Sequence, residues 1–166
     1  MDIVIREALA AEYGTLGEIT AQAYLGDGLL TFGEDDPYLA RLQDVAGRAR
    51  DGVILVAAAS DGQLLGGVAF AAPGSPLCDI AVAGEAEFRM LAVAREGRGR
   101  GAGEALVRAC MERARAIEGV RRLVLSTTQD MAGAHRIYER LGFVRTPERD
   151  WEPVPGLTLL TYGLEL

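Results

Sequence analysis

A short turn rich in glycine and arginine, Arg98-Gly99-Arg100-Gly101-Ala102-Gly103, most tightly constrains how this chain can fold. It lies between an extended segment, 85–93, and a segment with helical spacing of apolar residues, 101–117. Glycine has no Cβ, so the backbone of such a turn can approach a bound anion closely. The N–H groups at a helix start and the two arginines then favour negative charge. The order of strand, turn and helix therefore predicts a phosphate-binding turn.

Two common nucleotide-binding motifs do not fit this turn. It lacks the Gly-Lys-Ser/Thr sequence of a Walker-type site. A dinucleotide-binding fold places its glycines after the first strand and an acidic residue at the end of the next strand. Here the glycines follow the fourth predicted strand, and Glu118 ends a helix. A flexible, arginine-rich surface loop is the alternative interpretation.

Composition limits the class of protein. The chain has 166 residues, 49% of them hydrophobic, which predicts one globular domain over 1–166. A net charge of −7 argues against a nucleic-acid-binding protein, which needs a basic surface. Neither a membrane span nor a signal peptide is evident, so we expect a cytoplasmic protein without a membrane partner. Two cysteines and one histidine offer no zinc ligand set, so no metal is expected.

Hydrophobic periodicity and turn signals predict a mixed α/β (α+β) fold. The predicted strands are 3–6, 53–58, 64–71, 85–93, 121–128, 143–144 and 157–164, and the predicted helices are 8–23, 37–50, 101–117 and 132–141. Asp61-Gly62 is a hairpin signal, Gly26-Asp27-Gly28 should end the first helix, and Pro37 should be the first residue of the second. This order predicts a mostly antiparallel sheet of about six to seven strands, with about four helices on its two faces, in three layers.

Two motifs together resemble a known family. Arg98-x-x-Gly101-x-Gly103 is similar to the acetyl-CoA pyrophosphate motif of the GCN5-related N-acetyltransferases, the GNAT superfamily. The segment 134–143, AHRIYERLGF, is similar to a second signature of that family and follows at the separation usual there. The predicted strand and helix order matches along nearly the whole chain. The resemblance implies an N-acetyltransferase that uses acetyl-CoA as its co-substrate.

The resemblance also implies where acetyl-CoA binds. In this family, the strand that corresponds to 85–93 carries a bulge and diverges from the strand that corresponds to 121–128. The pantetheine arm enters that gap and pairs with backbone groups as an added strand would. The expected backbone partners are Leu91, Ala92 and Val93. The expected pyrophosphate-binding residues are Arg98, Gly99, Arg100, Gly101, Ala102 and Gly103.

Two side chains match acid and base positions of the family. Tyr138 matches the tyrosine that protonates the coenzyme A thiolate, and a phenol with a pKa of about 10 carries that proton at neutral pH. Glu87 matches a glutamate that some members, histone acetyltransferases among them, use to deprotonate the amine. Strand alternation puts Glu87 on the same face as Leu91 and Val93. The alternatives are a core aromatic for Tyr138, and for Glu87 a solvated carboxylate with a water chain as the base.

The resemblance places the amine acceptor near the first two helices, their connecting loop and the C-terminal hairpin. Those segments contain Tyr24, Phe32 and Trp151, close to carboxylates at 34–36. Aromatic rings beside carboxylates would suit a cationic amine with an apolar body. Solvated acidic loops and a packing role for the tryptophan are the alternatives. Many members carry an asparagine near the cofactor arm and the acceptor where this chain has Met131, whose side chain cannot form the same hydrogen bonds.

The sequence therefore predicts direct acetyl transfer from acetyl-CoA to a primary amine in a ternary complex. We expect a small-molecule amine as the partner. A homodimer is also expected to be possible, because dimers are frequent among the relatives. Cys110 lies in a predicted helix and gives no reason to invoke a cysteine-linked intermediate. A protein or peptide N-terminal acetyltransferase is one alternative. A non-catalytic acyl-CoA sensor, favoured only by Met131, is another.

Overall fold

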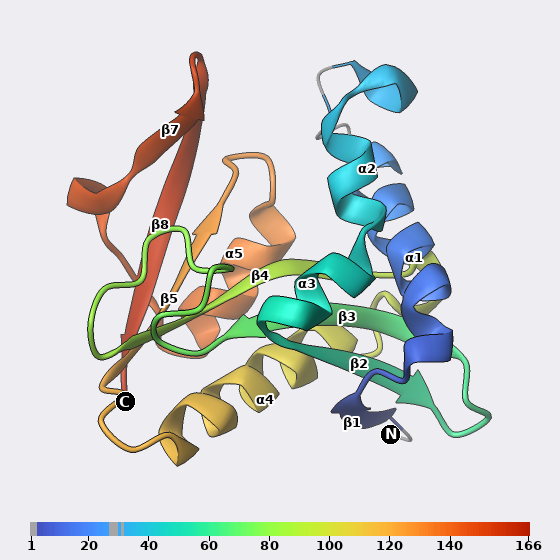
Figure 1. Ribbon diagram of the computed structural model, residues 1–166, viewed down its shortest axis with the longest axis horizontal. Helices are drawn as coiled ribbons and strands as arrows, with labels where there is room; N and C mark the ends of the chain where they lie inside the picture. Colours follow the sequence, from blue (N-terminus) through green and yellow to red (C-terminus); the bar gives the residue numbers. More distant parts are fainter. Residues whose placement is uncertain (1–2, 27–29, 31) are drawn as a thin grey trace. The chain divides into compact units, whose positions relative to one another are not determined.

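The computed structural model describes residues 3–26, 30 and 32–166 (Figure 1). The chain divides into two compact units that alternate along the sequence. Unit 1 comprises 1–70 and 90–109, and unit 2 comprises 71–89 and 110–166. Strand β4 (Glu85–Val93) and helix α4 (Ala102–Ala116) each begin in one unit and end in the other.

Unit 1 contains strands paired in the order β1-β2-β3-β4. They are β1 (Ile3–Glu7), β2 (Val53–Ala59), β3 (Leu64–Ala71) and the C-terminal half of β4. The hairpin predicted at Asp61-Gly62 is confirmed, since β2 and β3 pair antiparallel and Gly62 has φ +90°. Every residue of β3 is buried, so both faces of this strand are covered. Leu16 of α1 covers one of them, at the position of Gly67.

The helices of unit 1 differ in one respect from the prediction. They are α1 (Tyr13–Gly26), α2 (Tyr38–Gln43), α3 (Val45–Asp51), the first half of α4, and the short 3-10 helices η1 (Ala10–Glu12), η2 (Gly33–Asp35) and η3 (Arg95–Gly97). The single helix expected over 37–50 is wrong, because Asp44 has ψ +66° and its carboxylate caps α3 by accepting the Gly47 N–H at 2.9 Å. Pro37 precedes α2 and is not its first residue. Of the predicted helix stop, Gly26 ends α1, whereas 27–28 lie outside the described residues.

Unit 2 contains strands paired in the order β4-β5-β8-β6, with β7 paired to β8. They are the N-terminal half of β4, β5 (Arg122–Thr127), β6 (Val144–Arg145), β7 (Trp151–Val154) and β8 (Leu157–Glu165). The pairing of β4 with β5 is parallel and joins Glu85–Glu87 to Arg122–Val124. The other pairs of this unit are antiparallel. Its helices are the second half of α4, α5 (Ala132–Arg140) and the 3-10 helix η4 (Pro147–Arg149).

The predicted fold class is confirmed: the chain is mixed α/β with a mostly antiparallel sheet. The described residues form eight strands and five α-helices, more than the numbers predicted. The extra strand is β7, whose residues are mostly exposed and carry no buried alternation that could have identified it. The extra helix arises from the break at Asp44. One domain over 1–166 stays a prediction.

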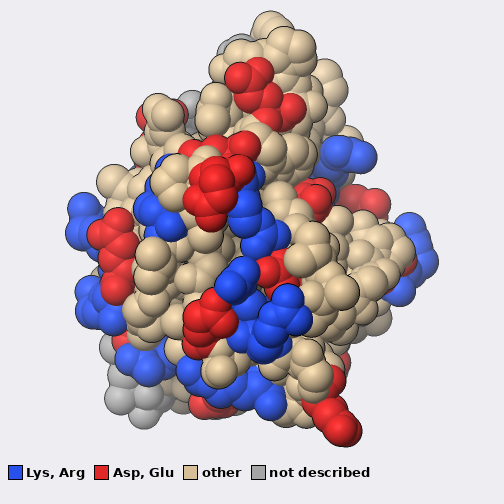
Figure 2. Space-filling model, turned by 90° about the vertical axis from the view of Figure 1, so that its left-hand side faces the viewer, with Lys and Arg blue, Asp and Glu red and all other residues tan. Residues whose placement is uncertain are grey.

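Arginines on the surface lie beside acidic side chains. Figure 2 shows basic and acidic groups interspersed over the face that it draws. In unit 2, Arg122 contacts both Glu85 and Glu165, and Arg145 pairs with Asp150 at 2.8 Å. These arginines neutralise neighbouring carboxylates of the same unit. Within the described ranges, no helix combines the length and the apolar character that crossing a membrane requires.

Candidate functional site

The glycine- and arginine-rich turn of unit 1 joins η3 to α4. Gly99 and Gly101 have φ of +76° and +83°, a left-handed conformation that other residues adopt only at a cost. Among the described residues, no atom outside the immediate chain neighbours lies within 4 Å of the position that a Cβ on Gly99 would take. The turn therefore needs glycine for its backbone conformation and leaves open space around it, as a cradle for an external anion requires.

Not all of the predicted amides of this turn are open. Arg98 and Arg100 donate their backbone N–H groups within the turn, to the carbonyls of Arg95 and Gly97 at 3.2 and 3.4 Å. Ala105 donates to the Gly101 carbonyl at 3.0 Å and closes the first turn of α4. The N–H groups of residues 102 and 103 precede that bond, and such groups at a helix start have no partner inside the helix. The geometry thus favours these two amides as anion donors.

The end of β4 contains the three residues predicted to pair with the cofactor arm. Ala92 is buried, and Leu91 and Val93 are partly buried. The Ala92 carbonyl lies 2.5 Å from the position of a Cβ on Gly66, so β3 packs closely against this part of β4. Met90, directly before these residues, has φ +58°. This irregularity stands where a bulge was expected, and it interrupts the strict alternation that we predicted from Glu87 to Val93.

In unit 2, Glu87 is fully buried on β4, with 0% of its surface exposed. Its Oε1 atom accepts three consecutive backbone N–H groups, those of Asp79, Ile80 and Ala81, each at 3.0 Å. Its Oε2 atom is also buried and has no hydrogen-bond partner among the described residues. The alternative of a solvated carboxylate is therefore wrong, because strand pairing and the loop at 79–81 enclose this side chain.

Burial decides the pKa of Glu87. Loss of hydration disfavours the charged form and raises the pKa of this carboxyl above its usual range, against the opposing effect of the three N–H donors. The negative charge of Asp79 raises it further. A carboxyl with a raised pKa is a better match to a proton-accepting role near neutral pH than an ordinary one.

Glu85, two residues earlier on β4, has the opposite environment although it is equally buried. Burial alone would raise its pKa, but hydrogen bonds from Arg149, from the Val82 N–H and from Arg122 outweigh it and hold the pKa below the usual range. Arg149 donates to both of its oxygens, at 2.9 and 3.0 Å. Glu85 is thus a member of a salt-bridge network that favours its ionised form.

Tyr138 belongs to an aromatic cluster in unit 2. Its ring centroid lies 5.9 Å from that of Phe88, 5.9 Å from that of Phe143 and 5.7 Å from that of Tyr162. Only 3% of the residue is exposed. These contacts hold the ring in one orientation, which suits a core aromatic as well as a positioned acid, and its role as the acid stays a prediction.

The structure brings Tyr138 together with Phe88, the residue that follows Glu87 on β4. Because side chains alternate along a regular strand, Glu87 points to the face of β4 opposite to Phe88. The predicted acid and the predicted base therefore lie on opposite faces of the N-terminal half of β4.

Met131 and His135 lie at the end of β5. Thr127 donates its hydroxyl to the Met131 sulfur at 3.4 Å, and His135 Nε2 lies 2.8 Å from the Thr128 carbonyl oxygen. A carbonyl only accepts, so Nε2 carries the hydrogen and donates it. The histidine thus fastens α5 to the end of β5. The Thr128 hydroxyl is buried and has no partner within the described part of the chain.

The residues predicted to bind the acceptor fall in both units. In unit 1, Phe32 is 68% exposed and Tyr24 is partly buried. Asp36 caps the neighbouring backbone and accepts the N–H of Tyr38 at 2.9 Å. In unit 2, Trp151 is partly buried and donates its Nε1–H to the Ser126 hydroxyl at 3.0 Å. The exposed phenylalanine is available to a ligand, whereas the indole N–H already has a partner.

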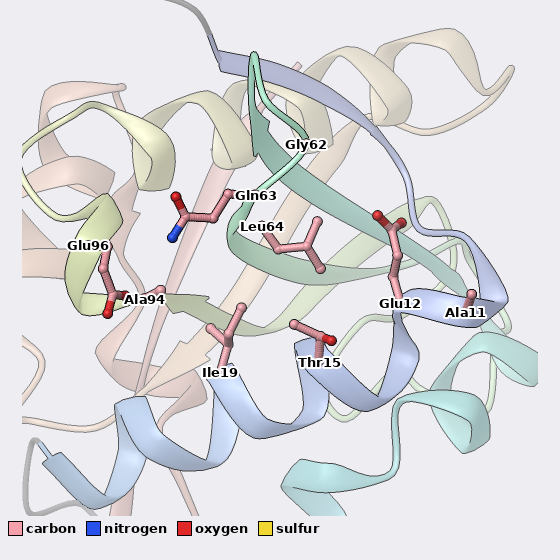
Figure 3. A pocket seen from close by; sticks show the side chains of 9 residues that line it. All are labelled: Ala11, Glu12, Thr15, Ile19, Gly62, Gln63, Leu64, Ala94 and Glu96. Atoms are coloured by element: carbon pink, nitrogen blue, oxygen red, sulfur yellow. The ribbon is translucent and has the colours of Figure 1, made fainter.

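Unit 1 also has an open cavity of about 470 Å³ that the sequence did not indicate (Figure 3). Figure 3 shows Gln63 and Glu96 on one side of it and Glu12 on the other. The Glu12 carboxylate makes two hydrogen bonds with Arg6, at 2.8 Å each, which lower its pKa to about 2. The residues that line the cavity are Ala11, Glu12, Thr15, Ile19, Gly62, Gln63, Leu64, Ala94 and Glu96. None of the predicted site residues lines this cavity.

Sequence reasoning missed the partners of the two β4 glutamates. The loop amides at 79–81 and the guanidinium of Arg149 carry no motif, and Arg149 lies far from Glu85 in the sequence. Only the pairing of the strands brings them together. Among the described residues, no group of three histidine, cysteine or acidic side chains could hold a metal ion.

Known proteins similar to this chain share its fold and one family model. Residues 18–143 match the model of the acetyltransferase (GNAT) family. A GNAT superfamily phosphinothricin acetyltransferase from Sinorhizobium meliloti, in complex with acetyl-CoA, has a TM-score of 0.72 and 21% identity over 100% of this chain and 89% of its own. A ribosomal-protein-alanine N-acetyltransferase from Brucella melitensis has a TM-score of 0.71 and 25% identity, covering 98% and 99%. A GCN5-related N-acetyltransferase from Kribbella flavida has a TM-score of 0.70 and 22% identity, covering 99% and 98%. No curated protein matches the chain in sequence.

Proposed function

Because the chain belongs to the acetyltransferase (GNAT) family, we propose that it transfers the acetyl group of acetyl-CoA directly to the nitrogen of a primary amine. The observation that carries this proposal is the turn before α4. Its left-handed glycines and the amides of the first helical turn suit the diphosphate of coenzyme A, and they lie within the part of the chain that the family model matches. Bound acetyl-CoA would supply an activated thioester.

The cofactor would be bound mainly by backbone groups. The amides of residues 102 and 103 would donate to the diphosphate, with Arg98 and Arg100 adding positive charge. Leu91, Ala92 and Val93 would pair with the amide groups of the pantetheine arm, next to the irregular backbone at Met90. Backbone recognition of this kind tolerates the loss of the asparagine that Met131 replaces.

Two side chains would handle the protons of the transfer. Tyr138 would donate its hydroxyl proton to the departing thiolate, and Glu87 would accept the proton of the substrate ammonium at Oε2, with a water chain as the alternative base. Burial raises the pKa of the Cys110 thiol, which supports direct transfer without a cysteine-linked intermediate.

The acceptor is proposed to be a small-molecule amine. The exposed ring of Phe32 and the carboxylates at 34–36 would attract a cation with an apolar body. The similar proteins acetylate different acceptors, as the names phosphinothricin acetyltransferase and ribosomal-protein-alanine N-acetyltransferase state. A peptide N-terminus is therefore the second acceptor class, and the same acidic segment would attract it.

A thiol-release assay tests the proposal. The purified chain is mixed with acetyl-CoA and a panel that contains amino acids, polyamines and peptides with free N-terminal alanine. We expect free coenzyme A to appear with at least one amine, and mass spectrometry to show that amine carrying one acetyl group. Calorimetric binding of acetyl-CoA without thiol release from any amine would instead identify an acyl-CoA sensor. The absence of binding heat at millimolar acetyl-CoA would overturn both proposals.

A further inference from the structure

The loop between β3 and β4 is built around one carboxylate oxygen. Three successive amides, those of Asp79, Ile80 and Ala81, all donate to Glu87 Oε1 at 3.0 Å. Successive N–H groups that converge on a single point form an anion-binding concavity, or nest. Here the anion is part of the chain itself, and it is fully buried.

The same loop is also fastened at its sides. Arg89 pairs with Asp79 at 3.0 Å and donates to the Leu77 carbonyl at 3.3 Å, and Arg149 donates to the Ile80 carbonyl at 2.8 Å. These contacts come from β4 and from η4. They restrict the three amides to the positions from which they reach Glu87.

The two oxygens of Glu87 are therefore chemically different. A proton on Oε1 would face three N–H groups that already point at that atom, which is electrostatically unfavourable. Oε2 is buried and no described residue donates a hydrogen bond to it. Of the two oxygens, only Oε2 can take a proton without displacing the loop.

We propose that the backbone amides of Asp79, Ile80 and Ala81 are positioning groups for the base: they hold Oε1 of Glu87 and leave Oε2 as the atom that accepts the proton of the substrate ammonium. This inference rests on the proposed function. The first ammonium proton passes to Oε2 through a water, because Oε2 is buried, and the freed nitrogen lone pair forms the bond to the acyl carbon. The C–S bond of the tetrahedral intermediate then breaks, and the thiolate leaves with the proton of Tyr138. The second nitrogen proton restores the phenol by way of solvent, and the carboxylic acid of Glu87 returns its proton to solvent.

The charged and titratable groups around Glu87 set the direction of each test. Asp79 and Cys78 come from the loop, and Glu85 and Arg89 come from β4. Its cross-strand neighbour on β5, Val124, carries no charge. Arg149 of η4 acts on the loop through the Ile80 carbonyl and on Glu85 directly. Of these groups, the side chain of Asp79 can lose its charge without the loss of a donor to Oε1, because its donor is the backbone N–H.

The experiment combines two variants with opposite expected effects. Asp79→Asn removes a negative charge and frees Arg89, so the pKa of Glu87 falls. Ala81→Pro removes one N–H donor to Oε1, so the pKa of Glu87 rises. Glu118→Gln is the control, because it removes a charge that makes no contact with Glu87. The pKa is measured in the free enzyme from the carboxyl ¹³C resonance of Glu87, and the amide resonances of 79–81 should follow the same midpoint.

The pH dependence of kcat/KM gives a second readout that a purely structural role would not move. Its acid limb should shift to lower pH with Asp79→Asn and to higher pH with Ala81→Pro. If Ala81→Pro fails to fold, the Asp79→Asn shift alone decides. Unmoved carboxyl and amide titrations in Asp79→Asn would overturn this inference while leaving acetyl transfer intact. Moved titrations with an unmoved acid limb would overturn the role of Glu87 as the base, and with it this inference, without touching acetyl transfer.

Discussion

The turn at 98–103 and the loop at 79–81 both aim backbone N–H groups at an anion, but they do so in opposite environments. The turn uses glycines in left-handed conformations, lies largely at the surface and suits an external anion. The loop uses Asp79, Ile80 and Ala81, is tied down by arginines and encloses a carboxylate of its own strand. The first arrangement can bind and release an external anion, whereas the second holds a carboxyl group of the chain itself.

This difference separates binding from proton transfer. An open group of amides gains affinity from a ligand that arrives with its own charge. An enclosed carboxylate is desolvated and has a raised pKa, so it is prepared to take up a proton. Changes at the turn should therefore alter cofactor affinity, and changes around β4 and α5 should alter turnover and its pH dependence.

The largest expected effect is a loss of turnover on removal of the predicted acid, Tyr138, which belongs to neither group of amides. Tyr138→Phe removes only a hydroxyl and keeps the aromatic packing, so turnover should fall by about 10²-fold or more while acetyl-CoA affinity stays within about twofold. Tyr162→Phe is the matched control, since it removes the hydroxyl of a neighbouring ring that bonds to Glu139 at 3.3 Å. Thiol release and calorimetry measure the two quantities. Equal turnover in the two variants would remove the acid assignment.

The second effect tests the role of the enclosed carboxyl group of Glu87. Glu87→Gln keeps an oxygen that can accept the three loop amides but cannot take a proton, so turnover should fall by about 10- to 100-fold. The loss should be greatest below the pH at which the amine deprotonates by itself and should shrink above it. Turnover measured across this pH range provides the check. A loss of the same size at every pH would count against the base role and indicate a structural one.

The third effect tests whether the turn at 98–103 binds acetyl-CoA. Gly99→Ala forces a Cβ onto a backbone with φ +76°, at a strain of about 1 kcal/mol, so acetyl-CoA affinity should fall about fivefold. Gly119→Ala is the matched control, because Gly119 has φ +86° and equally open surroundings but lies in the turn between α4 and β5. Both variants should lose similar thermal stability. Equal acetyl-CoA affinity in the two, measured by calorimetry, would show that the turn does not bind the cofactor.

The smallest effect concerns stability and contrasts the two glutamates of β4. The lowered pKa of Glu85 means that its stabilisation is present above the unfolded value, 4.5, and is lost as the pH falls through the folded value. The raised pKa of Glu87 has the opposite sign, because its neutral form fits the fold better, so stability declines as the pH rises from 4.5 towards the folded value.

Urea unfolding at several pH values should show both slopes. Relative to the unmodified chain, Glu85→Gln should become less stable as the pH rises towards 4.5, and Glu87→Gln should become more stable above it. Each change amounts to about 1.4 kcal/mol per unit of pKa shift. The same slope for both variants would contradict the assignment of opposite environments.

The elements of the fold were predicted where the signal is local. The hairpin at Asp61-Gly62, strand β3 and the strand, turn and helix from β4 to α4 follow from turn residues and periodicity. The break at Asp44 was missed because the apolar spacing continues across it. The new helix start depends on a single capping carboxylate, that of Asp44. Strand β7 was missed because its pairing with β8 forms it, with little burial of its own.

The sequence by itself determined the fold class, the family resemblance and the turn before α4, because glycine spacing and periodicity act over a few residues. Only the tertiary structure decided the state of Glu87. From the sequence it could equally be solvated, since its three donors come from a loop without a motif and its burial comes from its neighbours in space. Hydration and hydrogen bonding set the charge of a carboxyl, and both depend on what the folded chain brings near it.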